Sequence, residues 1–441
     1  MQYSYKQIWI IVYPILISLL MEHLIGMTDT AFLGRVGEIE LGASALGGVY
    51  YLAILMLGFG FSIGAQIMIG RRNGEKNYKD IGAIFSQGTL FLMALAVVIF
   101  ILSKAFSPAI LRPLIQSDQI YDATLRYMDW RVYGFFFAFA EAMFRAFFVG
   151  TTNTRILTSN AIVAVLSNVL FNYILIFGKL GFPALGIEGA AIGSSAAELV
   201  SLIYFIIYTW YKVDKKKYNL FRFTRFRPKL LLRILDTSLW TMIQTFVSVS
   251  TWFLFFIAVE HLGEHSLAIS NIVRSISSLL FLTTSAFAST TSSLVSNLMG
   301  AGEQRQIMAL VRRMIKMCYF FVLPLIAIIA LFPTLLLRIY TDNLSLIADS
   351  VSAMLVLLSA YVLNVPANIL FNTVSGTGNT RSAFLMELVT LAIYALYTVY
   401  VVFYLRVDVA VAWTTEHVYA IVMIALSYTY LKKARWQNKK I

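Results

Sequence analysis

The sequence predicts an all-α membrane protein whose chain crosses the bilayer about twelve times. Hydrophobic residues make up 59% of the 441 positions and charged residues only 13%. A soluble protein of this composition would expose too much apolar surface. The apolar residues form long runs between short polar stretches, and each run has the roughly 20 residues that a spanning helix needs. Strands of a membrane barrel would be about 10 residues long with alternating polarity, a pattern that this sequence lacks.

Twelve apolar runs are long enough to be predicted as spanning helices. They cover residues 8–33, 43–69, 83–104, 127–149, 156–178, 186–211, 236–259, 267–298, 315–338, 346–374, 382–405 and 409–431. The first run is predicted to be a span and not a cleavable signal sequence, because it has no small-residue cleavage site and continues for a full span.

The loops between the spans alternate in charge. The loops after spans two, four, six, eight and ten, together with the C-terminal segment, hold most of the basic residues. The positive-inside rule therefore places both termini in the cytoplasm, and we expect a multi-pass protein of the inner membrane. The net charge of +13 does not indicate nucleic-acid binding, because the basic residues gather in loops on one side of the membrane.

The longest polar stretch divides the sequence into two halves. We predict a six-helix N-terminal lobe over 1–214, a basic cytoplasmic linker over 215–234 and a six-helix C-terminal lobe over 235–441. The basic residues of this region include Lys212, Lys215, Lys216, Lys217, Arg222, Arg225, Arg227 and Lys229. We expect a solvated loop that touches anionic lipids, in preference to a binding site for a regulatory protein.

An internal repeat relates the two halves. Three pairs of loop segments match at offsets of 226, 226 and 228 residues: Val36-Gly37-Glu38 with Leu262-Gly263-Glu264, Gly150-Thr-Thr-Asn-Thr-Arg155 with Gly376-Thr-Gly-Asn-Thr-Arg381, and Gly74-Glu75 with Gly302-Glu303. Because six spans separate the copies, both halves have the same orientation in the membrane. Two such bundles around a central cavity suit a transporter that works by alternating access, although a static scaffold can also arise by duplication.

Motifs of soluble enzyme chemistry are missing from the sequence. It has no P-loop, no HExxH, no GxSxG and no cluster of cysteine and histidine. A membrane-embedded acyl or glycosyl transferase would need His or Asp residues clustered at a loop mouth, and none is evident. The one cysteine, Cys318, excludes a disulfide framework. We expect no enzyme and no cofactor.

Polar side chains away from span ends are the candidate coupling residues, because ionised carboxylates in hydrocarbon are costly and mark function. Asp29 and Glu22 are seven residues apart in the first span and share one helix face. Asn168 and Asn172 share a face of the fifth span and lie at similar depths to Glu22 and Asp29. Structural alternatives stay open: helix packing for Asp29, a pairing with a neighbouring helix for Glu22, and interhelical hydrogen bonds for the two asparagines.

Other intramembrane charges are weaker candidates for substrate binding or coupling. Glu141 and Glu198 fall near mid-membrane in spans four and six, and Glu141 has Arg145 one turn away as a possible partner. Arg274 in span eight either pairs with an acid across a cavity or reaches the outer interface.

The two halves differ in their acids. The second half has Glu387 and Glu416, which we place near span ends, and the offset of 226 puts Phe255 at the position of Asp29. The coupling site is therefore expected in the first half alone.

The coupling ion is H⁺ or Na⁺. A buried carboxyl group can bind a proton and release it when its surroundings rewet. The same carboxylates with the amide oxygens of Asn168 and Asn172 offer the hard oxygen ligands that Na⁺ prefers. H⁺ is preferred, because Asn172 stands where an anionic residue would favour Na⁺.

Several segments resemble one known family. The stretch Met27-Thr-Asp-Thr-Ala-Phe-Leu-Gly-Arg-Val-Gly37 resembles the first-helix signature of multidrug and toxic compound extrusion (MATE) transporters. Gly70-Arg-Arg-Asn-Gly-Glu75 resembles the loop after their second helix. Asn168-Val-Leu-Phe-Asn172 and Gly186-Ile-Glu-Gly-Ala-Ala-Ile-Gly193 resemble their fifth and sixth helices, although this pattern usually ends in Asp where the chain has Asn172. Spans seven and ten lack the acids of the NorM-like branch, so the pattern is closer to the DinF-like branch.

The resemblance implies a secondary antiporter that exports lipophilic organic cations in exchange for H⁺ or Na⁺, with coupling in the N-terminal lobe. It also implies that bending of helix one at Pro14 couples cation binding to substrate release. The alternative is a lipid-linked oligosaccharide flippase of the same superfamily, which Arg274 favours because anionic lipids need basic residues in the cavity. The expected partners are small amphipathic cations and membrane lipids, and we expect the chain to act as a monomer.

Overall fold

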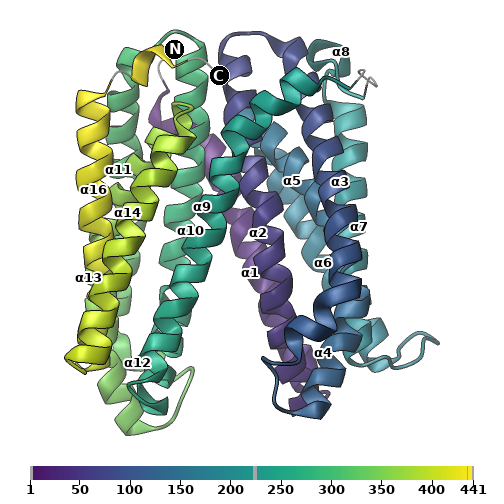
Figure 1. Cartoon of the computed structure of the whole chain (residues 1–441), viewed down its shortest axis with the longest axis vertical. Helices are drawn as coiled ribbons and strands as arrows, with labels where there is room; N and C mark the ends of the chain where they lie inside the picture. The colour runs from purple at the N-terminus through teal and green to yellow at the C-terminus, as the bar shows by residue number, and fades with distance from the viewer. Residues whose placement is uncertain (1–2, 222–225, 435, 440–441) are drawn as a thin grey trace. The chain divides into compact units, whose positions relative to one another are not determined.

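The computed structural model describes residues 3–221, 226–434 and 436–439, and every regular element within these ranges is helical (Figure 1). Arg222 and Arg225 of the predicted linker lie outside the described residues. Eleven of the described helices are long and apolar enough to cross a membrane, or twelve when one bent pair is counted as a single span. The predicted all-α polytopic fold is therefore confirmed.

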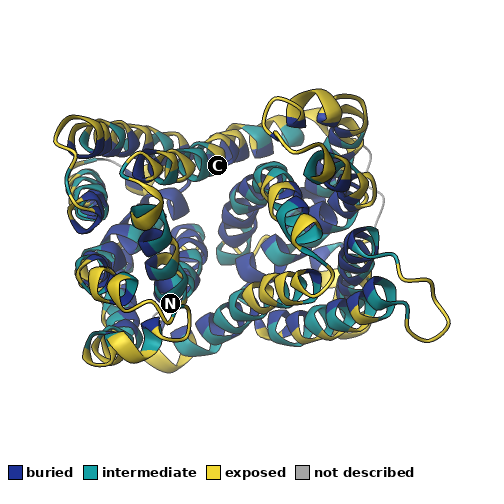
Figure 2. Ribbon diagram, turned by 90° about the horizontal axis from the view of Figure 1, so that it is seen from below, coloured by how far each residue is buried: buried dark blue, intermediate teal, exposed yellow. Residues whose placement is uncertain are grey.

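The chain divides into two compact units. One consists of residues 13–242, and the other of residues 1–12 together with 243–441. Helices α1 (Tyr5–Gly34) and α9 (Pro228–Glu260) have residues in both units. In each unit, buried residues lie on the helix faces that pack against neighbours, and exposed residues lie on the opposite faces (Figure 2).

The unit of residues 13–242 contains most of α1, all of the helices between α1 and α9, and the start of α9. After α1 these are α2 (Glu38–Gly74), α3 (Tyr78–Leu111), α4 (Asp118–Arg131), α5 (Gly134–Gly150), α6 (Arg155–Phe177), α7 (Ile187–Lys212) and α8 (Lys215–Tyr218). Helix α4 begins after Ser117, whose hydroxyl caps the helix by accepting from the Ile120 amide. Helix α6 ends at Gly178 in the left-handed region (φ 66°), which is the usual way for a helix to stop at glycine.

The fourth predicted span is not a straight helix. Helices α4 and α5 meet at a bend of 51°, and the predicted span 127–149 begins inside the last turn of α4. Gly134, the first residue of α5, lies so close to its neighbours that a Cβ there would meet Arg131, Glu198 and Tyr51. The break thus lets a charged side chain at the end of α4 enter the helix bundle.

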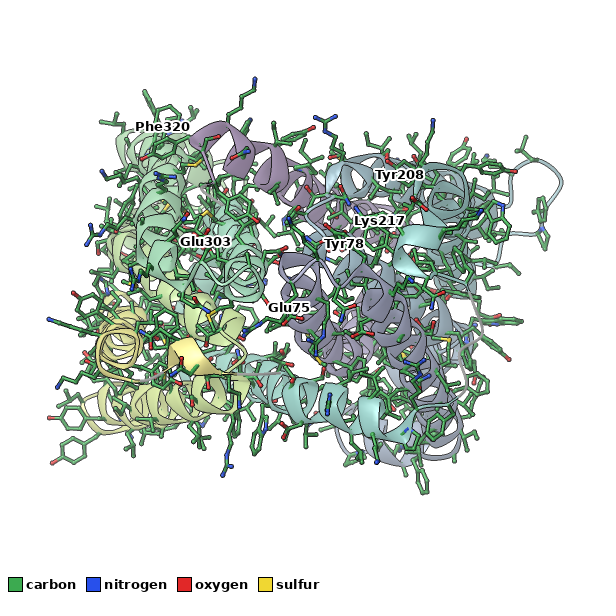
Figure 3. All side chains as sticks on the ribbon, turned by 90° about the horizontal axis from the view of Figure 1, so that it is seen from above. Glu75, Tyr78, Tyr208, Lys217, Glu303 and Phe320 are labelled. Carbon is green, nitrogen blue, oxygen red and sulfur yellow. The ribbon has the colours of Figure 1, made fainter. Side chains whose placement is uncertain are left out.

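The start of the predicted linker packs against the bundle. Tyr218 at the end of α8 is buried, and its ring meets that of Tyr78 edge-on with centroids 5.7 Å apart. The Lys217 ammonium lies 4.1 Å from the centre of the Tyr78 ring (Figure 3). Gly82 of α3 leaves room for the carbonyl groups of Tyr218 and Asn219. Helix α9 begins at Pro228, inside the range predicted as linker, because proline suits the first position of a helix.

The other unit holds the remaining helices. After α9 these are α10 (Glu264–Gly300), η1 (Gln304–Gln306), α11 (Ile307–Leu331), α12 (Pro333–Leu337), α13 (Leu344–Gly376), α14 (Thr380–Val399), the π-helical turn η2 (Tyr400–Tyr404), α15 (Val409–Ala412), α16 (Thr415–Lys433) and η3 (Trp436–Asn438). Side chains cap two of these helices: Asn343 accepts from the amides of Ser345 and Leu346, and Asp408 accepts from that of Val409. Helix α13 packs against both α10 and α16 in this unit.

Candidate functional site

Asp29 lies in a polar cluster built by three helices. The Nδ2 of Asn172 on α6 donates to Asp29 Oδ1 at 2.6 Å, and the Ser194 hydroxyl on α7 donates to Asp29 Oδ2 at 3.3 Å. The Nδ2 of Asn168 donates to Ser194 Oγ, and the Nδ2 of Asn172 also donates to Asn168 Oδ1, both at 3.2 Å. We call Asp29, Asn168, Asn172 and Ser194 the Asp29 cluster. Asn172 is 0% exposed and Asn168 is 1% exposed, so the cluster lies inside the bundle.

Close packing of α6 against α7 positions the two asparagines. They are one helical turn apart, which directs both side chains to the same face of α6. A Cβ at Gly193 of α7 would meet Asn172 Oδ1, so only glycine leaves room for this amide. That Oδ1 atom is buried and has no hydrogen-bond partner among the described residues. The cluster therefore holds a spare acceptor beside the carboxylate.

Ser194 is the member of the cluster that the sequence did not reveal. It stands in the run Gly193-Ser194-Ser195, which is equally typical of helix packing by small residues. Only the approach of α7 to α1 and α6 shows that its hydroxyl bonds to Asp29.

The chemistry of the cluster suits a single monovalent cation. It offers carboxylate, amide and hydroxyl oxygens, which are hard ligands, and no nitrogen or sulfur ligand of a transition metal. Across the described residues, no group of three or more His, Cys, Asp or Glu side chains could hold a metal ion. With one carboxylate, the cluster is neutralised by one proton or one Na⁺.

Glu22 is not part of the Asp29 cluster, contrary to the prediction of a shared coupling site. Its Oε1 accepts from Arg145 Nη1 at 2.8 Å and from the Ser18 hydroxyl at 3.1 Å. Its side chain is 55% exposed. Glu22 and Asp29 share a helix face but lie about two turns apart on it. Glu22 therefore meets α5, whereas Asp29 meets α6 and α7. Arg145, which the sequence offers as a possible partner of Glu141 on its own helix, reaches across to Glu22 on α1 instead.

Glu198 belongs to a second buried network, which includes an arginine that the sequence did not single out. Arg131 at the end of α4 forms two hydrogen bonds to the Glu198 carboxylate, at 2.9 and 2.5 Å. The Tyr51 hydroxyl donates to both oxygens of Glu198 at 3.2 Å, and the Arg131 guanidinium lies 3.6 Å from the centre of the Tyr51 ring. Arg131 is 8% exposed. Sequence periodicity does not show the break after α4 that turns this charge inward.

The two networks meet on α7. Ser194 donates to Asp29, and its neighbour Ser195 accepts from Arg131 Nη1 at 3.4 Å. Movement of this segment of α7 would therefore disturb both networks together.

Glu141 and Arg274 lie outside both networks. One carboxylate oxygen of Glu141, Oε1, is buried without a hydrogen-bond partner in the described part of the chain. Arg274 on α10 is exposed, and its guanidinium lies 5.6 Å from the ring centres of both Trp252 and Phe256 on α9. Its contact is thus with aromatic faces, and no ion pair joins it to another described residue.

Glu387, the acid that the sequence places near the end of a span in the second half, is buried in the helix bundle. This residue is 3% exposed and lies two turns inside α14. Its Oε1 accepts from the Ser248 hydroxyl at 2.6 Å, and its Oε2 accepts from that of Tyr419 at 3.0 Å. Glu416, in the first turn of α16, accepts from the Tyr394 hydroxyl at 3.3 Å.

The repeat-related position of the Asp29 cluster is aromatic. At the offset of 226 residues, Asp29 and Asn168 correspond to Phe255 and Tyr394, whose ring centroids are 6.2 Å apart. The same two positions thus contact each other in both halves. At the position of Asp29 itself, a carboxylate is found in the first half alone.

A multi-pass helical membrane protein with a duplicated helix order, and with one carboxylate held among amide and hydroxyl groups of two other helices, is of the transporter class. The profile of the MatE family matches residues 14–174 and 241–401, one match in each half, and the chain belongs to this family. Its members are transporters and not enzymes.

Curated relatives carry consistent names. The chain is 26% identical to the "Probable multidrug resistance protein NorM" of Idiomarina loihiensis over 67% of this chain and 64% of that protein. It is 29% identical to the protein of that name from Synechocystis over 48% of this chain and 46% of that protein. These matches span less than two thirds of the relatives' lengths. A match to "Probable multidrug resistance protein YoeA" of Bacillus subtilis, 21% identical, covers 97% of this chain and 93% of that protein.

Solved structures show the same fold. An outward-facing multidrug resistance MATE family transporter of the MOP superfamily superposes with a TM-score of 0.89 at 18% identity, covering 97% of this chain and 95% of that one. A MOP superfamily transporter from Pyrococcus furiosus gives a TM-score of 0.88 at 19% identity, covering 98% and 97%. The eukaryotic MATE transporter AtDTX14 gives 0.86 at 15% identity, covering 98% and 96%.

Proposed function

We propose that the chain is a secondary antiporter of the inner membrane that exports lipophilic organic cations in exchange for H⁺ or Na⁺. The observation that carries this proposal is the Asp29 cluster. It places one carboxylate on α1 among amide and hydroxyl groups of α6 and α7, with no basic side chain hydrogen-bonded to it among the described residues. The family and the relatives named as probable multidrug resistance proteins support efflux of drugs.

Cation binding at Asp29 changes its hydrogen bonds. When a proton binds Asp29 Oδ1, the resulting O–H group faces the N–H donor of Asn172 Nδ2. Two hydrogen-bond donors then point at each other. Rotation of the Asn172 amide by half a turn removes the conflict, because its unpartnered Oδ1 then faces Asp29 as an acceptor. The same rotation offers an amide oxygen to Na⁺. Cation loading thus rearranges the contact between α1 and α6.

Helix α1 is the element that carries this change. Pro14 lies beside the point where α1 passes from one compact unit to the other. A proline inside a helix removes a backbone hydrogen bond and permits bending. We assign the bending of α1 at Pro14 as the step that links cation binding at Asp29 to release of the drug.

H⁺ is the preferred coupling ion. Asn172 supplies no charge to the cluster, so Asp29 provides its one anionic ligand. A neutral amide and one carboxylate suffice for a proton, whereas a Na⁺ ion that must lose its water gains from a second carboxylate.

Organic cations are preferred over lipid-linked oligosaccharides as substrates. The flippase alternative depended on Arg274 as a cavity base for anionic lipids. Arg274 instead contacts the rings of Trp252 and Phe256, and a single arginine is weak support for binding a diphosphate. The proposal also places both termini in the cytoplasm. It includes membrane lipids as partners and a chain that acts as a monomer.

Gradient-driven efflux from vesicles tests the function. The purified chain is reconstituted in vesicles loaded with a fluorescent lipophilic cation, and a pH gradient or a Na⁺ gradient is imposed separately. We expect the pH gradient to drive dye movement and the Na⁺ gradient to drive little. Dye movement that responds to neither gradient would overturn the antiporter proposal.

A further inference from the structure

A basic cavity lies where α9 begins, in the unit of residues 13–242. Its volume is about 560 Å³. It is lined by the end of α2, the first two turns of α3 and the segment from Phe226 to Arg233. Four lining side chains are basic, namely Arg72, Arg227, Lys229 and Arg233, and Asp80 is the one acidic residue in the lining. The cavity therefore has an excess of three positive charges.

Three of these cations have no counter-charge within the described residues. The carboxylate of Asp80 accepts from Asn77 Nδ2 at 2.6 Å, and Arg72 pairs with Glu75 at 2.6 Å. Arg227, Lys229 and Arg233 are exposed and form no ion pair with any described residue. Like charges held this close repel one another unless an anion lies between them. The cavity thus has the electrostatics of an anion site.

The backbone around the cavity is anchored. The amide of Arg227 donates to Gln87 Oε1 at 3.2 Å, and Gln87 on α3 is 2% exposed. This bond ties the start of α9 to a buried side chain. Helix α9 then runs for 33 residues, and the positive end of its dipole lies at the cavity. The basic side chains and the helix dipole therefore both favour a negatively charged ligand.

Apolar groups lie in the cavity wall and beside it. Phe226 and Leu232 on either side of the start of α9 are 59% and 66% exposed, and the buried Ile84 of α3 forms part of the wall. A free phosphate ion gains nothing from such surface. An amphiphile places its charged head among the bases and its chain along the aromatic ring.

We propose that this cavity binds a phosphate-bearing ligand and that the phosphate is the headgroup of an anionic phospholipid. On the proposed topology the cavity opens at the cytoplasmic surface, where anionic lipids attract basic segments. The site is separate from the Asp29 cluster and goes beyond the proposed transport. Because α9 has residues in both compact units, a lipid held at its first turn is placed to influence how that helix moves.

Lipid binding to the full chain tests this site. Purified protein in neutral detergent is titrated with phosphatidylglycerol carrying a fluorescent acyl chain. Parallel titrations use labelled phosphatidylcholine and inorganic phosphate as a competitor. We expect saturable binding of phosphatidylglycerol, at least tenfold tighter than that of phosphatidylcholine, and little competition by millimolar phosphate.

Matched charge variants localise the binding. The triple variant R227Q/K229Q/R233Q removes three charges from the cavity, and K212Q/K216Q/K432Q removes three exposed charges elsewhere. We expect the first variant to bind phosphatidylglycerol at least tenfold more weakly and the second to bind like the unmodified protein. Equal binding by all three proteins would overturn the site. Displacement of the lipid by low phosphate concentrations would identify free phosphate as the ligand and overturn the lipid assignment.

Discussion

Asn172 donates a hydrogen bond to Asp29 at 2.6 Å, although 143 residues separate them in the chain. The bond joins α6 to α1, and Asn172 is fully buried. Each proton or Na⁺ that binds Asp29 must therefore act on Asn172 as well. On the proposed function, the loading of one carboxylate thereby changes the contact between two helices.

Substitution of Gly193 by alanine is expected to impair coupling without touching Asp29. The new methyl group would overlap Asn172 Oδ1 and push its amide out of the place where it can turn beside Asp29. We expect gradient-driven dye efflux to fall at least tenfold while the protein stays folded. Gly26 on α1 is the matched control, because a Cβ there meets nothing within 4 Å; G26A should transport normally. Normal transport by G193A would show that the amide need not move.

An aspartate in place of Asn172 is expected to change the ion dependence. Two carboxylates would then face each other in a buried site, and their repulsion favours a bound cation. We expect N172D to acquire Na⁺-driven dye movement, measured in vesicles under a Na⁺ gradient alone. A variant whose efflux still follows only the pH gradient would argue against Asn172 as an ion ligand.

The Arg131–Glu198 pair is expected to stabilise the first unit, but only as a pair. Removing one partner leaves the other charge buried, which typically costs about 3–5 kcal/mol. We expect R131Q and E198Q each to lower the thermal unfolding temperature in detergent. The double variant R131M/E198M should recover most of the loss, since it removes both charges. Single and double variants of equal stability would contradict the pairing.

Replacement of Glu387 tests whether coupling occurs in the first half alone or in both halves. This residue is as buried as the asparagines of the Asp29 cluster, yet its carboxylate is held by Ser248 and Tyr419. Because coupling is assigned to Asp29, E387Q is expected to retain gradient-driven efflux in vesicles, with at most a few-fold loss. Complete uncoupling by E387Q would place a second coupling site in the second half.

Most of the fold could be predicted from sequence because the bilayer imposes helix length and hydrophobicity. Each of the twelve predicted spans overlaps a helix or helix pair of the structure. The bend between α4 and α5 could not be predicted, since no proline stands at the break. The packing of α8 against the bundle through Tyr218 could not be predicted from the sequence either, because one aromatic residue in a basic stretch does not indicate burial.

The site was predictable in part. Intramembrane position alone selected Asp29, Asn168 and Asn172, and the structure brings these three together. Position along a helix could not show that Glu22 meets Arg145, because a shared face does not specify which neighbour each residue contacts. Ser194 and Arg131 were missed for a related reason: their roles depend on how α7 packs and where α4 ends.

Proton flux measured together with drug binding tests the role of Asp29 most directly. Vesicles with the purified chain and an internal pH dye are given an organic cation under a pH gradient, and proton movement is compared between the unmodified protein and D29N. Coupling at Asp29 predicts drug-dependent proton movement in the unmodified protein and none in D29N, with drug binding and thermal stability retained. Drug-dependent proton movement of equal size in D29N would contradict it.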